Sequence, residues 1–205
     1  MAAVRGDRRP APKREGEVIE AATQVFYERG FGVATVQQVA DELGINKGSL
    51  YYYIRTKEDL LYRIFDQVHA DVEDILNDVM EADDLDELGR IELYVRKQIA
   101  YSLEHLERLS VYHQEMDHLT GLRRDEVRDR RRRHDYIVTR LIKDAQAAGQ
   151  VNPDYNARLL SDCLFAIVIS THRWYQRGGR VSRKTVVDHC AGFVLRGLAG
   201  ELQRS

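Results

Sequence analysis

The sequence predicts an all-α protein, and three observations support this class. Apolar residues recur with a period near 3.6 along most of the 205-residue chain, which is the spacing of one helical face. Only three prolines occur, and no turn pair of hairpin type separates runs of β-branched residues. Hydrophobic residues make up 43% of the chain, enough for one large core or two small ones. We expect about nine helices, three in an N-terminal domain (15–60) and the rest in a larger domain (61–205).

The composition limits the partners and the compartment. A formal charge of −2 excludes a polycation, so any attraction to nucleic acid must come from a local basic surface. Cys163 and Cys190 are the only cysteines and stand among apolar residues, which predicts reduced, buried thiols. No secretory leader and no apolar run of about 18 residues is present. We expect a soluble, cytoplasmic protein that needs no cofactor.

Residues 1–14 read as a disordered basic arm, because they are rich in proline and arginine and have no apolar face. Five cations stand against one acid: Arg5, Arg8, Arg9, Lys13 and Arg14. The arm is either a solubilising tail or a segment that touches DNA phosphates or a minor groove.

The first two helices are predicted from their ends and their apolar stripes. The first spans 14–29 and ends at Gly30. Thr35 is expected to cap the second, whose apolar residues follow at i, i+3, i+4 and i+7. Gly44 then stops this helix after two turns.

A third helix is predicted over 47–54, with Asn46 as its cap, and the three elements form a helix-turn-helix layout. Tyr51, Tyr52 and Tyr53 cannot all face a core, since neighbouring helical residues point about 100° apart. Their hydroxyls can donate to DNA phosphates, and Gly48 lets the backbone approach a groove. The alternative is that Tyr51 and Tyr53 pack on neighbouring helices and expose only their hydroxyls.

A fourth helix is expected to begin after its cap, Thr56, and to continue to about residue 80. Lys57 lies in its first turn, where the helix dipole disfavours a cation. We expect this lysine to face a phosphate.

The stretch "TVQQVADELGINKGSLYYYIRTKEDLL" (35–61) resembles the DNA-binding segment of TetR-family transcriptional regulators. Asn46 and Ile54 depart from the commoner serine and phenylalanine, and both changes are conservative. The resemblance implies a ligand-binding domain after the fourth helix and a homodimer formed by the last two helices. It also implies DNA contacts by Thr35, Lys47, Ser49, Tyr51, Tyr52, Tyr53 and Lys57.

The second domain is predicted to contain helices near 85–107, 109–118 and 122–148, followed by two strongly apolar ones. Pro153 is expected to open the first of these two (154–175), and Ser182 to cap the last (183–202). Their apolar stripes exceed the needs of one core face, and the last carries small residues such as Gly192. We expect them to form the dimer interface, and a dimer would read a palindromic operator.

Two stretches resemble a subgroup of TetR regulators that govern lipid and sterol catabolism and respond to acyl-CoA thioesters: "THRWYQRGGRVS" (171–182) and "VYHQEMDHL" (111–119). Such a ligand needs an apolar tunnel and cations for its phosphates. The arginine run at 128–133 could also supply cations, although a solvated helix face is the favoured interpretation. Trp174 could be a plug or a ligand wall. The candidate ligand residues are Tyr112, His113, Glu115, His118, Phe165, Ile169, Arg173, Trp174 and Arg177.

His113 and Asp117 share a helical face, but two ligands are too few for a zinc site, and no metal is expected. The leading hypothesis is a repressor that leaves its operator when an effector shifts the fourth helix. A regulator of efflux or stress genes that senses an apolar, drug-like ligand stays open as an alternative. A thioester-acting enzyme using Ser170 and His172 is disfavoured, because no nucleophile-elbow motif is present. A scaffold that never releases DNA would have a filled second core.

Overall fold

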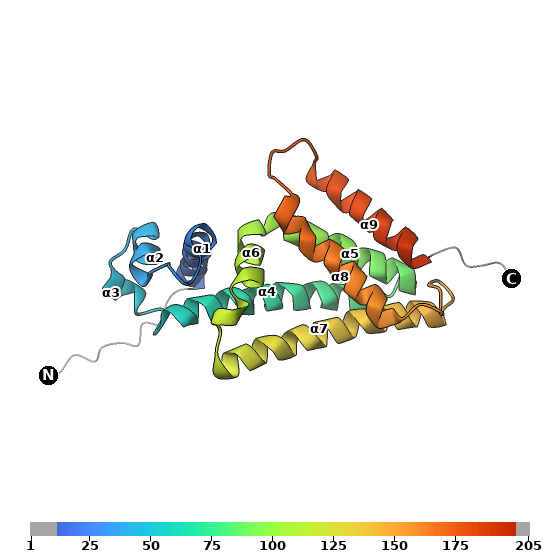
Figure 1. Cartoon of the computed structure of the whole chain (residues 1–205), viewed down its shortest axis with the longest axis horizontal. Helices are drawn as coiled ribbons and strands as arrows, with labels where there is room; N and C mark the ends of the chain where they lie inside the picture. Colours follow the sequence, from blue (N-terminus) through green and yellow to red (C-terminus); the bar gives the residue numbers. More distant parts are fainter. Residues whose placement is uncertain (1–11, 200–205) are drawn as a thin grey trace.

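The protein is described here by a computed structural model covering residues 12–199, and within that range it consists of helices and loops only. Most of the predicted basic arm therefore lies outside the described residues. The all-α class is confirmed. Figure 1 shows the N-terminal helices grouped at one end and a long helix that runs from them to the remaining helices.

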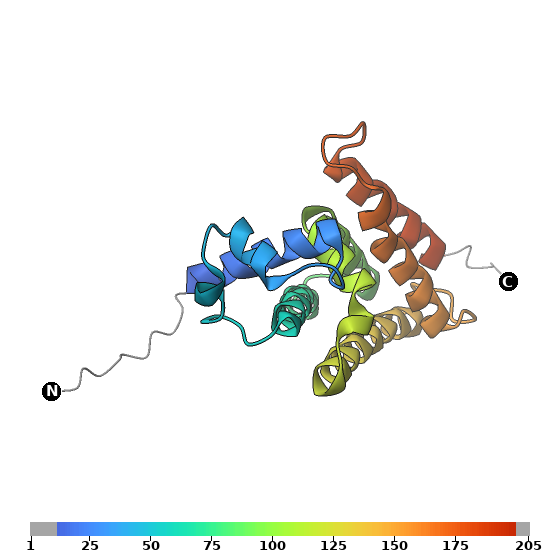
Figure 2. The ribbon, with the colours of Figure 1, turned by 60° about the vertical axis from the view of Figure 1, so that its left-hand side comes forward.

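The N-terminal unit consists of α1 (Pro12–Arg29), α2 (Val36–Glu42) and α3 (Lys47–Leu50), grouped at the same end in both views (Figures 1 and 2). Gly30 and Gly44, at the ends of the first two helices, have φ values of 77° and 64°. Glycine adopts this left-handed conformation without steric cost, so the predicted helix ends are confirmed.

The predicted caps of the first domain are confirmed. Thr35 forms a capping box with Gln38, in which each side chain accepts from the other residue's backbone N–H. Asn46 accepts from the Ser49 backbone at 2.7 Å. Thr56 caps α4 in the same way as Thr35 caps α2.

The third helix is shorter than predicted. Regular α-helix ends at Leu50, and residues 51–53 form a turn. The backbone N–H groups of Tyr52 and Tyr53 donate to carbonyls three residues back, at 3.2 and 2.9 Å. Such i→i+3 bonds tighten a final turn, and they bring the chain round toward the next helix within three residues.

The long helix α4 (Lys57–Met80) links two hydrophobic cores. Its first half, with Leu60, Ile64 and Phe65, packs in the cluster that also holds α1 and α3. Its last turns, with Leu76 and Val79, belong to the cluster of the second domain. The first cluster also takes in buried residues of α6 and α7, so it extends beyond the predicted domain boundary at 60.

The second domain is built from α5 (Glu87–Glu104), α6 (Leu106–Gln114), the short 3-10 helix η1 (Met116–His118), α7 (Gly121–Ala147), α8 (Ala157–Trp174) and α9 (Arg183–Ala199). The helix expected over 85–107 ends earlier, because His105 (φ −114°, ψ 46°) leaves the helical region. Within residues 12–199, no helix is both long and apolar enough to span a bilayer.

Of three predictions about the last two helices, two are wrong and one is confirmed. Pro153 does not open α8; Asn156 does, with its side chain accepting from the backbones of Arg158 and Leu159 at 3.0 and 3.1 Å. Cys163 is exposed rather than buried, because it lies on the outer face of α8. Ser182 accepts from the Thr185 backbone at 3.1 Å, as a cap does.

Candidate nucleic-acid interface and ligand pocket

The turn after α3 presents aromatic side chains to solvent. Tyr52 is 84% exposed and Tyr51 47% exposed. Tyr53 is half-buried and packs against the first core. The alternative interpretation, in which part of the tyrosine rings pack on neighbouring helices, therefore fits Tyr53 better than Tyr52.

The first turn of α3 is small and open. Lys47 and Gly48 are exposed, and Ser49 is half-buried. A Cβ at position 48 would lie 3.3 Å from Oδ1 of Asn46, which caps the same helix. A glycine here therefore keeps both the cap and the outer surface of the turn free of side-chain atoms.

The structure gives Lys57 partners other than the predicted phosphate. Its ammonium donates to the backbone carbonyls of Phe31 and Ala34, at 2.6 and 2.8 Å, and lies 4.3 Å from the centroid of the Phe31 ring. Burial is the main reason that its pKa is lowered. Lys57 thus stabilises the loop that leads to Thr35. This role explains why a cation lies in the first turn of α4 without a DNA phosphate.

Glu115 and His118 were expected to line the pocket, and the structure places them elsewhere. Glu115 Oε1 accepts from the Phe31 backbone N–H at 3.1 Å, in a buried contact between residues 84 positions apart. Its other oxygen lies 2.9 Å from His118 Nδ1, and the His118 ring packs against Phe31. These residues join the second domain to the loop between α1 and α2.

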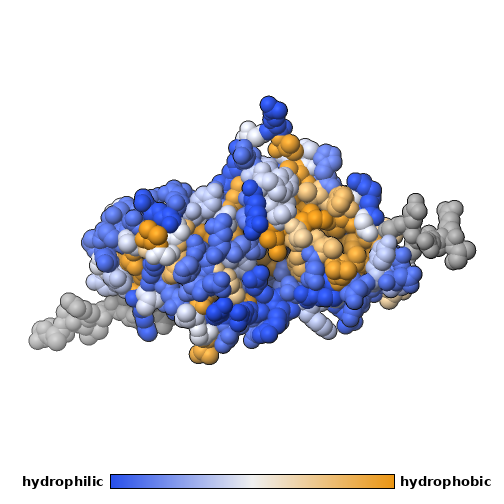
Figure 3. Space-filling model, in the orientation of Figure 1, coloured by the Kyte–Doolittle hydropathy of each residue, from blue (hydrophilic) through white to orange (hydrophobic). Residues whose placement is uncertain are grey.

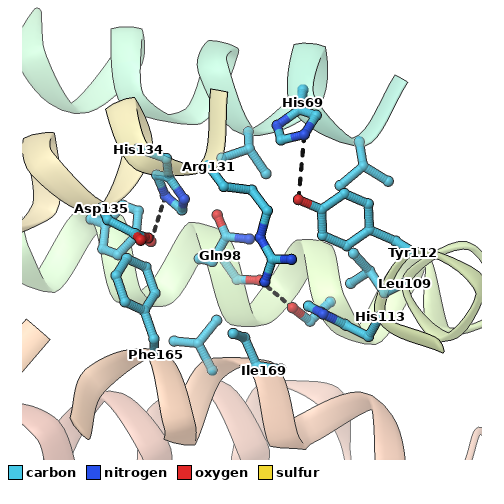
Figure 4. Close-up of a pocket in the computed structure, with 15 residues that line it drawn as sticks. His69, Gln98, Leu109, Tyr112, His113, Arg131, His134, Asp135, Phe165 and Ile169 are labelled. Carbon is cyan, nitrogen blue, oxygen red and sulfur yellow. Dashed lines mark hydrogen bonds between the residues drawn. The ribbon is translucent and has the colours of Figure 1, made fainter. Parts of the chain in front are cut away.

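A cavity of about 230 Å³ lies between α4, α5, α6, α7 and α8, and Figure 4 shows its lining. Four of the predicted ligand residues meet there: Tyr112, His113, Phe165 and Ile169. An open internal cavity is not what a scaffold with a filled second core would show.

The sequence reasoning missed most of the polar lining. These residues come from α4, α5 and α7: His69, Tyr94, Gln98, Ser102, Arg131, His134 and Asp135. Arg131 belongs to the run interpreted as a solvated face, and that interpretation is wrong for this residue. A usable signal was the i, i+3 pair Arg131 and His134, which places polar groups on the inward face of α7.

Burial keeps the pocket histidines neutral at physiological pH. It is the first cause that lowers the pKa of His69 to about 4, of His113 to about 3 and of His134 to about 4, and the Arg131 charge lowers all three further. The ring of His69 lies 3.4 Å from the Tyr112 hydroxyl, and that of His134 lies 2.9 Å from the Tyr94 hydroxyl. Within residues 12–199 no three His, Cys, Asp or Glu side chains are arranged to hold a metal.

Arg173, Trp174 and Arg177 do not line this cavity. Arg177 forms a forked ion pair with Glu107, at 2.6 and 2.9 Å, and also donates to the Glu104 carbonyl. Arg173 is exposed, and Trp174 is 52% exposed at the end of α8. Trp174 is therefore neither a buried plug nor a wall of the enclosed pocket.

A hydrophobic patch gathers over α8 and α9 on the face seen in Figure 3. Among the large apolar side chains of these helices, Leu159 is 62% and Phe193 is 66% exposed. Cys163, also exposed, lies one turn beyond Leu159. Apolar surface of this kind on a soluble helix pair is typical of a protein–protein contact.

Comparison with protein families gives matches over most of the chain. Residues 18–64 match the model described as "Bacterial regulatory proteins, tetR family". Residues 84–198 match the model described as "Tetracyclin repressor-like, C-terminal domain".

Full-length relatives are also found. The HTH-type transcriptional repressor KstR2 of Mycobacterium tuberculosis is 27% identical over 193 residues, covering 92% of this chain and 94% of the relative. The structure of that organism's ketosteroid transcriptional regulator KstR2 superposes with a TM-score of 0.86, at 23% identity over 94% of this chain and 98% of the other. AibR in complex with isovaleryl coenzyme A and operator DNA gives a TM-score of 0.80, at 20% identity over 88% and 97%.

Proposed function

Because the chain belongs to the TetR family of bacterial regulatory proteins, we propose that it is a homodimeric repressor released from its operator by an acyl thioester. It is a DNA-binding, ligand-responsive transcriptional regulator. The proposal concerns the residues that touch DNA, the effector and the route between the two sites. As a regulator of bacterial genes it would act in the cytoplasm.

The exposed turn at 47–52 is the proposed DNA-reading surface. Lys47 and the Tyr52 hydroxyl supply phosphate contacts, and the small first turn lets the backbone enter a major groove. The α8 and α9 patch of Leu159 and Phe193 would pair with its copy in a second protomer, so that two reading turns face one palindrome. Thr35, Ser49, Tyr51 and Tyr53 remain predicted contacts.

An acyl thioester suits the internal cavity only in part. Its volume of about 230 Å³ is below the roughly 300–1,000 Å³ of a pocket that encloses a drug-sized ligand. We infer that the acyl group enters and that the coenzyme A portion stays outside, near the exposed Arg173. AibR, which has the same fold, was solved with isovaleryl coenzyme A, a thioester with a small acyl group.

The proposed switching mechanism is supported by α6 and by Glu115, the residue that directly follows this helix. Leu109, Tyr112 and His113 of this helix line the cavity. Glu115, two residues further on, holds the Phe31 backbone at 3.1 Å in the loop that leads to Thr35. A ligand that displaces the α6 wall would therefore disturb the loop before α2, in addition to any shift of α4.

Arg123 and Thr120, at the start of α7, add a second link. Arg123 pairs with Asp59, and the Thr120 backbone donates to Glu58 at 3.1 Å. Both acids lie in the first turn of α4. A coupling of about 1–3 kcal/mol through these links would change operator affinity by roughly 5- to 150-fold.

The proposal is tested by selecting an operator from a random duplex library and then titrating the bound complex with hexanoyl-CoA in a band-shift experiment. We expect palindromic sequences, one or more dimers per site, and release on addition of the thioester. Sequence-independent binding would refute the reading role, and a complex that no acyl-CoA releases would refute the effector class.

A further inference from the structure

Arg131 stands out from the other arginines of its run because it points into the cavity (Figure 4). Its neighbour Arg130 pairs with Asp66 and Glu73, at 2.6 and 2.9 Å. Arg132, on the other side, pairs with Asp129. No carboxylate partner of Arg131 exists among the residues the structure describes, and its guanidinium lies 5.6 Å from the centroid of the Tyr112 ring.

The one acid of the lining is paired with another arginine. Asp135 is the only acid there, and its carboxylate lies 3.6 Å from Arg158, which approaches from α8. Burial raises the pKa of Asp135, whereas the charges of Arg158 and Arg131 lower it. Burial is the first cause that lowers the pKa of the three lining histidines. Among the lining residues Arg131 is therefore the permanent cation, and the carboxylate nearest to it in the lining is in an ion pair with Arg158.

A second polar group in the wall lacks a partner. Gln98 is 7% exposed, and its Oε1 has no hydrogen-bond partner among the described residues. Its backbone carbonyl is already used by the Ser102 hydroxyl, at 2.9 Å. Gln98 and Arg131 both line the cavity (Figure 4). Because buried polar groups are nearly always satisfied, an unpaired amide oxygen and a guanidinium without a carboxylate partner in one cavity indicate that the cavity takes up a polar molecule.

We propose that the cavity binds a carboxylate carried on a compact apolar body, with the Arg131 guanidinium as its anchor. A guanidinium matches a carboxylate with two parallel hydrogen bonds. Phe165, Val168 and Ile169 supply the apolar wall opposite, and a hydroxyl or amide N–H on the ligand satisfies Gln98. The carboxylate is either that of a free acid or the far end of an acyl chain whose other end is the thioester. The second source rests on the proposed function.

The test is calorimetric titration of the full-length protein with two matched pairs of probes. Adipyl-CoA and hexanoyl-CoA differ in a terminal carboxylate against a methyl group. Cyclohexanecarboxylate and its methyl ester differ in charge, and neither carries a hydrogen-bond donor. We expect the charged member of at least one pair to bind at least about tenfold more tightly, since a charged hydrogen-bonded pair in a partly dry site is worth at least that factor.

The variants Arg131→Met, Arg131→Lys and Arg132→Met assign the preference to one side chain. Arg131→Met should remove the preference by weakening the charged member of the pair by at least about tenfold. Arg131→Lys keeps the charge but cannot form two parallel hydrogen bonds to a carboxylate, so it should retain an intermediate preference. This variant provides the readout if Arg131→Met does not fold. Arg132→Met, a matched change on the exposed face of α7, should behave as the wild type.

Each outcome counts for or against the subsite. Equal affinities within both pairs, or a preference that survives Arg131→Met, would overturn it. Selectivity for cyclohexanecarboxylate without binding of either thioester would support the anion subsite and contradict the thioester effector. Release of operator DNA by hexanoyl-CoA and adipyl-CoA at equal concentrations would support the proposed function and contradict a thioester source of the carboxylate.

Discussion

Lys47 and Lys57 carry the same charge in opposite surroundings. Lys47 is exposed on the first turn of α3, whereas Lys57 is held by the carbonyls of Phe31 and Ala34. The dipole argument correctly marked Lys57 as unusual, but a loop 23 to 26 residues away supplies the negative partners. The sequence pattern indicates that this lysine needs a negative partner, but it does not identify the partner.

The two lysines can be separated by replacing each with methionine. Lys57→Met should lower the free energy of unfolding by about 1 kcal/mol, because two partly buried carbonyls lose a charged donor. Lys47→Met should leave stability within about 0.5 kcal/mol and reduce the salt dependence of operator binding by about one phosphate contact. Urea denaturation and operator titration at several salt concentrations measure these effects. Equal stability losses would contradict the assignment.

At the scale of elements, α6 is both a pocket wall and a link to the DNA-binding domain. Its last residues continue into Glu115, whose carboxylate holds Phe31. The sequence predicts a polar ligand-binding stretch at 111–119. Tyr112 and His113 of this stretch face the cavity, while Glu115 and His118 face the first domain, and ligand binding by the first two stays a prediction. The end of a helix and the turn after it can contact two different parts of the protein, because the chain changes direction there.

Glu115→Ala should uncouple the effector from DNA. Without the acceptor for the Phe31 N–H, ligand affinity should stay within about threefold, while the ligand-induced loss of operator affinity should shrink to a small factor. Asp117→Ala, two residues further along the chain, removes an exposed carboxylate that pairs with Arg124 and is the control. Ligand titrations with and without operator measure the coupling between the two sites. An unchanged coupling in Glu115→Ala would exclude a route through Glu115 and Phe31.

The pair α8 and α9 carries the proposed dimer contact. Leu159→Asp and Phe193→Asp should each weaken the dimer by at least about 100-fold, since a carboxylate would be buried without a partner. Leu122→Asp places the same charge on another exposed leucine, at the start of α7, and should leave the dimer intact. Light scattering across a dilution series reports the mass. A monomeric wild type would remove the interface altogether.

At the scale of the whole molecule, the cavity makes stability depend on pH. His69, His113 and His134 have pKa values of about 4, 3 and 4 in the fold, against 6.5 for an unperturbed histidine. Between pH 6.5 and 4 these histidines bind protons in the unfolded chain and stay neutral in the folded chain. Lowering the pH through this range therefore favours unfolding. Asp59, with a pKa of about 2, adds a loss only below about pH 4.

We therefore expect the free energy of unfolding to fall by a few kcal/mol between pH 7.5 and 5.0, at up to roughly 1.4 kcal/mol per pH unit for each histidine. Chemical denaturation at a series of pH values gives the slope. His69→Gln should reduce it by about a third, and His189→Gln, at an exposed position, should leave it unchanged. A pH-independent stability across this range would show that the three rings are not held neutral.

The sequence by itself determined the all-α class, most of the helices and the caps of the first domain, although it extended the third helix to residue 54. Thr35, Asn46 and Thr56 act within three residues, and Gly30 and Gly44 act on their own backbone, so local pattern is enough. Only the tertiary structure decided which polar groups meet in the pocket, that Lys57 and Glu115 hold the same loop, and that Arg131 points inward. Those contacts join residues 23 to 84 positions apart, or depend on how α7 is rotated against its neighbours. The period of apolar residues shows which face of a helix is buried, whereas the packing of the helices decides which residues that face contacts.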